Sequence, residues 1–174
     1  MLEDTPLAVT AIGVEALRDH DITRLNEIKN LVPNLNWQQT PVGLNQSAQF
    51  RIRGIGTTRI AAAFDPGVGV YVDGVYFSRS VRAVTSVIDI QRIEVLRGLQ
   101  GTLFGKNSIG GAISLTTVKP HEELESLAQV RPGNLGSVDT RAMVNLPILD
   151  KLLTRFSIST NNFDGFTFNT TTDE

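Results

Sequence analysis

The stretch Arg92-Ile-Glu-Val-Leu-Arg-Gly98 decides the fold of this chain. It has the pattern of a β-strand that ends at a glycine. Four more glycines follow between residues 101 and 112, at positions 101, 105, 110 and 111. A loop this rich in glycine needs backbone freedom or the close approach of another surface. We therefore expect a strand that leads into a closely packed loop.

Four further blocks lie before and after this stretch. They are Phe50-Arg-Ile-Arg-Gly54, Val70-Tyr-Val-Asp-Gly-Val75, Leu103-Phe-Gly105 and Gly110-Gly-Ala-Ile-Ser-Leu-Thr116. Their order and spacing resemble the plug domain of TonB-dependent outer-membrane receptors, whose blocks read roughly IRG, VDGV, RIEVLRGPQ, LYG and GGVINIVT. Each block alone is a weak signal, but all of them in order form a specific one. The resemblance covers residues 5 to 120 nearly end to end.

The sequence departs from the family pattern at two places. Leu99 stands where the family usually has proline after the LRG block, and Asn107 and Ser108 fill a loop that is often smaller. Neither departure gives a reason to expect a different fold.

Composition limits the class of protein. At 174 residues the chain is long enough for one domain, or for one domain and a remnant. Its net charge of -2 provides no basic field for nucleic acid. It contains no cysteine, which excludes disulfides, thiol nucleophiles and cysteine-ligated metals. No apolar run approaches the roughly 20 residues of a transmembrane helix, and no signal peptide precedes Leu7.

The N-terminal part predicts a strand at Leu7–Ile12 and then one helix. Asp21 is a candidate cap for this helix, and Pro33 ends it. Residues 34 to 47 are rich in Asn, Gln, Pro and Gly and are expected to form a loop before a short strand at Ala48–Arg53. The apolar positions with helical spacing are Ile22, Leu25, Ile28 and Val32.

The next part predicts turns and a hairpin. Residues 54 to 58 and 65 to 67 are expected to form turns, and β patterns on both sides of Asp73-Gly74 are a strong hairpin signal. Two more strands are expected at Ile88–Leu96 and Ala112–Val118. The sequence therefore predicts an α+β fold, with a small mixed-sheet plug domain and short helices.

After Pro120 the pattern changes to long alternating strands. Residues 124–131, 137–146 and 154–161 each place apolar residues on one face and polar residues on the other. Strands of membrane barrels span about 9–11 residues with this alternation. A soluble antiparallel sheet with one wet face shows the same pattern, but the plug resemblance favours the barrel. The expected domains are a plug at 1–120 and about three first strands of an incomplete β-barrel at 121–174, in a family whose barrels have about 22 strands.

No catalytic constellation is present. Gly105-Lys106 lacks the remaining residues of a phosphate loop, and Gly54-Ile-Gly56 lacks the third glycine of a dinucleotide fingerprint. His20 and His121 are far apart in sequence and are interpreted as surface residues rather than metal ligands. Asp73 and Glu94 are interpreted as a turn residue and a polar strand residue. We therefore predict that the protein is not an enzyme and has no catalytic residue, metal or cofactor.

The resemblance implies roles for several residues in the motif blocks. Arg53 and Arg97 match plug arginines that pair with barrel glutamates, and a planar guanidinium suits such a bidentate pair. Without the resemblance, both are equally well interpreted as solvent-facing strand ends. The residues expected to form the motif turns are Gly54, Asp73, Gly74, Gly98, Gly105, Gly110 and Gly111.

Two loops are expected to face the ligand, again by the resemblance. They are residues 37–49 and 76–86, and aromatic and guanidinium groups in them suit a flat or anionic ligand. Tyr76 and Phe77 are equally well interpreted as core residues beside the hairpin. The candidate contacts are Trp37, Asn45, Gln46, Tyr76, Phe77, Arg79 and Arg82.

The resemblance implies a transport function at the Gram-negative cell outer membrane, with the plug inside the barrel lumen. Such receptors take up a scarce nutrient, for example an iron chelate, cobalamin or a glycan, when TonB and its inner-membrane energising complex pull on a segment before the plug. The expected partners are the remainder of the chain's own β-barrel, TonB, a small-molecule ligand and the outer membrane, with no nucleic acid. We expect a signal peptide and a TonB-binding segment to be encoded upstream of Met1. Alternatives are a truncated, non-transporting fragment that acts at most as a soluble binding domain, and an α+β enzyme.

Overall fold

The computed structural model describes residues 8–39, 48–56, 66–77, 88–105, 108–134, 136–149 and 152–162. The chain divides into two compact units, Met1–Val118 and Lys119–Glu174. Within the described residues, no helix is long and apolar enough to span a membrane.

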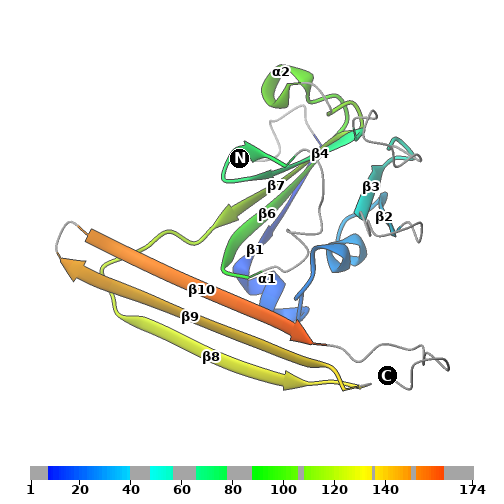
Figure 1. Cartoon of the computed structure of the whole chain (residues 1–174). Helices are drawn as coiled ribbons and strands as arrows, with labels where there is room; N and C mark the ends of the chain where they lie inside the picture. Colours follow the sequence, from blue (N-terminus) through cyan, green and yellow to red (C-terminus); the bar gives the residue numbers. More distant parts are fainter. Residues whose placement is uncertain are drawn as a thin grey trace, which may run out of the picture. The chain divides into compact units, whose positions relative to one another are not determined.

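A five-stranded sheet with the order β1-β6-β7-β4-β5 forms the centre of the first unit (Figure 1). The pair β4 and β7 is parallel and the other pairs are antiparallel, so the sheet is mixed. The strands span β1 (Ala8–Gly13), β4 (Val68–Val72), β5 (Val75–Tyr76), β6 (Ile90–Arg97) and β7 (Gly111–Thr117). This is the mixed sheet that the motif blocks predict.

Side chains alternate between the two faces of this sheet along each strand, and apolar side chains pack on both faces. On β6, Ile93 and Val95 enter the main core, whereas Leu96 enters a smaller cluster with Tyr71 and Ala112 on the other face. The smaller cluster also packs against Phe104 of the short helix α2 (Gly101–Phe104). The buried members of the main core are Ile12, Leu17, Ile22, Leu25, Ile28, Val32, Leu35, Phe50, Ile52, Val68, Val70, Ile90, Ile93, Val95, Ile113 and Leu115.

The prediction of one helix capped by Asp21 is wrong. The chain instead forms α1 (Val14–Asp19) and a 3₁₀ helix, η1 (Leu25–Asn30), and Asp21 lies between them with a φ of 50°. The Glu27 carboxylate accepts the backbone N–H groups of Thr23 and Arg24, which satisfies orphan donors at the start of η1 rather than at Asp21. The apolar positions that suggested one helix are nevertheless all buried in the main core.

The prediction of a loop from residue 34 to 47 is wrong in its first part. Leu35–Gln39 forms β2, which pairs antiparallel with β3 (Ala48–Ile52) and places Trp37 opposite Phe50. Tertiary pairing overrides the low β-propensity of the Asn and Gln residues here. Residues 40 to 47 lie outside the described part of the chain.

The second unit is a three-stranded antiparallel sheet with the order β10-β9-β8 (Figure 1). Its strands are β8 (Glu125–Pro132), β9 (Val138–Leu149) and β10 (Leu152–Asn162), of 8, 12 and 11 residues. The three long alternating strands predicted from the sequence are therefore present. Residues directly opposite each other share a face, so Ser126, Val144 and Phe156 form one row on one face, and Glu125, Asn145 and Arg155 form one row on the other.

Candidate functional site

Arg53 lies at the tip of a tight turn, one residue after β3 ends. Arg53 and Gly54 both have positive φ, 52° and 81°, and Ile52 and Ile55 exchange two backbone hydrogen bonds across them. The Arg53 N–H donates to the Asn34 carbonyl at 3.0 Å, which fixes the turn to the residue before β2. The Arg53 side chain is exposed, and within the described residues it has no acidic partner.

Arg97 ends β6 and is half-buried. Its Nε donates to the Ala8 carbonyl at 3.4 Å, a long hydrogen bond that ties the side chain to the first residue of β1. Arg97 thus lies on the five-stranded sheet, whereas Arg53 lies in the turn after the two-stranded sheet of β2 and β3. Neither has a carboxylate partner among the described residues, so the predicted pairing with barrel glutamates stays a prediction.

The glycine-rich block forms a close backbone crossing at Gly110 and Gly111. Gly110 accepts from the Gly98 N–H at 3.1 Å and donates to the Gly67 carbonyl at 2.8 Å. Gly111 has a φ of 147°, and a Cβ there would lie 2.3 Å from the Leu96 carbonyl oxygen. Two neighbouring segments therefore exclude any side chain at this crossing.

The Asp73-Gly74 hairpin turn is bound to the end of β7. Asp73 and Gly74 have φ values of 49° and 82°, which suits a type I′ turn. The Asp73 carboxylate accepts the Thr117 N–H at 2.9 Å and the Thr117 hydroxyl at 2.8 Å. The sequence identified the turn but not Thr117, because its spacing from Asp73 depends on the pairing of β4 with β7.

Replacing Asp73 with alanine is expected to lower the free energy of unfolding of the first unit by about 1–2 kcal/mol, because both hydrogen bonds to Thr117 are lost. Asp73→Asn is the matched control, since its amide oxygen still accepts the Thr117 N–H, and it should change stability by less than about 1 kcal/mol. Urea unfolding together with hydrogen exchange at the Thr117 amide measures both variants. An Asp73→Ala variant as stable as the wild type would show that the carboxylate is not what holds the end of β7.

The aromatic candidates for ligand contact lie partly in the core. Trp37 and Phe77 pack against the main core, and Tyr76 packs against Tyr71 with ring centroids 5.3 Å apart. The Tyr71 hydroxyl donates to the Phe104 carbonyl at 2.7 Å, and burial, with a smaller contribution from Tyr76, raises the pKa of Tyr71 above its ordinary value. The other candidates, Asn45, Gln46, Arg79 and Arg82, lie outside the described residues.

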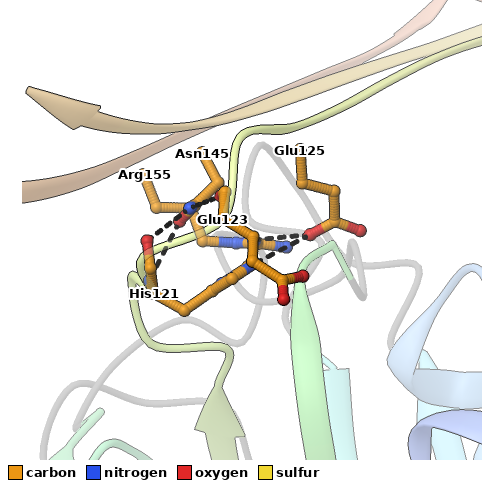
Figure 2. Close-up of polar contacts among 5 residues, drawn as sticks. All are labelled: His121, Glu123, Glu125, Asn145 and Arg155. Carbon is orange, nitrogen blue, oxygen red and sulfur yellow. Dashed lines mark hydrogen bonds and ion pairs between the residues drawn. The ribbon is translucent and has the colours of Figure 1, made fainter.

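A polar network that sequence reasoning missed lies at the start of the second unit (Figure 2). The Asn145 side chain on β9 is fully buried. Its Nδ2 donates to the carbonyls of His121 at 2.8 Å and Glu123 at 2.6 Å, and its Oδ1 accepts the His121 N–H at 3.3 Å. Asn145 therefore uses both the oxygen and the nitrogen of its side-chain amide to hold the segment that leads into β8.

An ion pair extends this network along the same row of side chains. Arg155 Nη1 on β10 lies 3.1 Å from Glu125 Oε2 on β8, and the Arg155 side chain is only 6% exposed. His121 Nε2 lies 3.8 Å from the same carboxylate oxygen. His121, interpreted from the sequence as a surface residue, is half-buried in this network. The sequence shows that polar residues alternate with apolar ones along these strands. Only the strand register shows which polar side chains lie opposite each other.

Comparison with known proteins settles the family. The model of the TonB-dependent receptor plug domain matches residues 1–112. The chain belongs to the TonB-dependent receptor family. A pesticin receptor of Yersinia enterocolitica is 31% identical over 147 residues, which cover 83% of this chain and 21% of that protein, and a pesticin receptor of Yersinia pestis gives the same values. The chain thus spans about a fifth of the length of these relatives.

Solved structures of TonB-dependent receptors share the fold. The ferric yersiniabactin uptake receptor FyuA from Yersinia pestis superposes with a TM-score of 0.76 at 26% identity, over 89% of this chain and 24% of that one. The siderophore receptor PiuA from Acinetobacter baumannii, at 19% identity, shares the fold with a TM-score of 0.75, over 91% of this chain and 21% of that one.

Membership of the TonB-dependent receptors decides between the function classes. The family consists of outer-membrane transport proteins and not enzymes, so the interpretation of the chain as an α+β enzyme is excluded. The mixed sheet and the antiparallel strands match plug and barrel structures of this family.

Proposed function

We propose that this chain is the plug and the first barrel strands of an outer-membrane transporter that gates TonB-coupled uptake of an iron chelate. Support for transport comes from the polarity of β8–β10, whose polar face carries the Asn145 network while apolar side chains stay exposed on the other face. A soluble sheet buries its apolar face, whereas a membrane barrel turns it to lipid. The exposed apolar residues of the three strands include Val130, Val138, Leu146, Phe156 and Ile158.

Support for an iron chelate comes from the relatives. The neighbours with known structure include receptors described as taking up ferric yersiniabactin and other siderophores. The alternative substrates are cobalamin and glycans, and none of the described residues distinguishes these from an iron chelate.

The test is uptake by the complete receptor that carries this chain, expressed in a Gram-negative strain without its own siderophore receptors. We expect accumulation of at least one ⁵⁵Fe-loaded chelate from a panel of catecholate, hydroxamate and thiazoline types, and loss of this accumulation when TonB is deleted. Uptake of cobalamin or a glycan alone would contradict the substrate class. Iron uptake that does not depend on TonB would contradict the mechanism.

We also propose that Arg53 and Arg97 hold the plug by pairing with carboxylates of the barrel. The exposure of Arg53 on a rigid turn and the fixed position of the Arg97 guanidinium beside β1 support this role. Loss of both arginines would leave barrel carboxylates unpaired, which costs about 3–5 kcal/mol where such a pair is buried.

In the complete receptor, the double variant Arg53→Ala, Arg97→Ala is therefore expected to unfold its plug at lower urea concentration while the barrel stays folded. Arg92→Ala is the control, because its guanidinium already has a partner in Glu94 on the same strand, at 3.4 Å. If the plug of the double variant resists urea as well as that of the wild type, the pairing role is wrong.

A further inference from the structure

We propose that Asn145, together with the Glu125–Arg155 pair, forms a clamp that keeps residues 121–125 on the barrel sheet while the plug moves. This proposal rests on the proposed function, because it assigns the clamp a role during TonB-driven movement. The three side chains occupy one row across β8, β9 and β10. The clamp thus joins the start of β8 to β9 through Asn145 and, across β9, to β10 through Arg155.

The hydrogen bonds of Asn145 make the clamp strong. Its amide is fully buried and binds three backbone groups of a segment that otherwise has no strand partner. Any lifting of this segment would leave the His121 and Glu123 carbonyls and the Asn145 amide without these partners at once. Buried polar groups that lose their partners are costly, so the segment should open rarely.

The ion pair fixes the end of the clamped segment. The Arg155 guanidinium is almost completely buried and donates to Glu125, the first residue of β8. Lifting β8 would take the Glu125 carboxylate away from this buried guanidinium, which is costly. A pull transmitted through the chain from the plug would therefore be resisted before it peels β8 from β9.

On the plug side, Thr117 is held by the Asp73 carboxylate. Only residues 118–120 lie between that contact and the first residue held by Asn145. The Val118 N–H also donates to the Asp89 carbonyl, at 2.9 Å, so the structure assigns the freedom of the connection to Lys119 and Pro120.

The clamp is testable with a protease that cleaves after glutamate. Glu122 and Glu123 are exposed side chains within the clamped segment, so cleavage there requires the backbone to open rather than the side chain to be uncovered. The complete receptor in outer-membrane vesicles, with the heat-modifiable band as the check of folding, is treated with this protease. The variants are Asn145→Asp, which cannot donate to either carbonyl, and Asn145→Ser, a neutral variant that also lacks the two-donor amide.

We expect both variants to be cleaved after Glu122 or Glu123 at least about tenfold faster than wild type, which is the loss expected for roughly one buried hydrogen bond. Asn162→Asp, the same substitution at an exposed position of β10, should be cleaved at the wild-type rate. In cells during TonB-dependent uptake, the wild-type segment should stay protected and the Asn145 variants should become more accessible.

Equal cleavage of folded wild type and both Asn145 variants would overturn the clamp. Opening of the wild-type segment during uptake to the level of the variants would overturn its role in plug movement. Protection that depends on Asn145 in a receptor that transports nothing would instead refute the proposed function and leave the clamp as a structural element only.

Discussion

Replacing Gly111 with alanine is expected to lower the free energy of unfolding of the first unit by about 3 kcal/mol or more. The new Cβ would lie 2.3 Å from the Leu96 carbonyl oxygen and 2.8 Å from Ile52 Cδ1. The φ of 147° adds backbone strain for any residue with a side chain. Because Leu96 belongs to β6, which pairs with β7, relief would require β6 and β7 to separate.

Gly13→Ala is the matched control for this substitution. A Cβ at Gly13 meets no atom within 4 Å, and Gly13 does not have a positive φ. We expect this variant to retain wild-type stability within about 0.5 kcal/mol. Urea unfolding followed by tryptophan fluorescence compares the two, since Trp37 packs on the main core. Equal stability of both variants would mean that the crossing of the two segments is not as close as described.

The second large effect is expected on the apolar face of the barrel strands. Ile158 lies near the middle of β10, is 63% exposed and shares its row with Ala142 and Ala128. In the complete receptor, Ile158→Lys should destabilise the folded barrel by about 2–4 kcal/mol, because an ammonium group would face the hydrocarbon of the bilayer.

Ser157→Lys is the matched control on the adjacent position. Ser157 points to the opposite, polar face of the same strand, so its substitution should change stability by less than about 1 kcal/mol. Reversible urea unfolding of the receptor in lipid vesicles measures both variants. If Ser157→Lys is the more damaging substitution, the two faces are assigned the wrong way round.

The sequence predicted those parts of the fold whose signals are local. The Asp73-Gly74 hairpin follows from turn chemistry, and the three long strands follow from their alternation. The sequence did not predict α1, and the helix expected between Asp21 and Pro33 is the shorter 3₁₀ helix η1, although Ile22, Leu25, Ile28 and Val32 share a helical spacing. The strand β2 was missed because its pairing with β3 outweighs its polar composition.

Residues of the candidate site could be predicted from the sequence only where they lie in a family motif. Arg53, Arg97 and the turn glycines are found through the family blocks. Asn145, Arg155 and Thr117 have no such block, since each gains its partner through strand register over 22 to 44 residues of sequence. A single sequence gives the polarity of each strand but not which residues lie opposite each other.

The central claim is that β8–β10 belong to a membrane barrel and not to a soluble sheet. Amide hydrogen exchange on the purified chain in dilute buffer tests it most directly. Without lipid and further strands, the outer edges of this sheet are unpaired and its apolar face has no bilayer to enter. We expect weak protection in residues 124 to 160 and strong protection in the described strands between 68 and 97, with association of chains in water. Protection of 124 to 160 as strong as that of 68 to 97, in a monomer, would contradict the account.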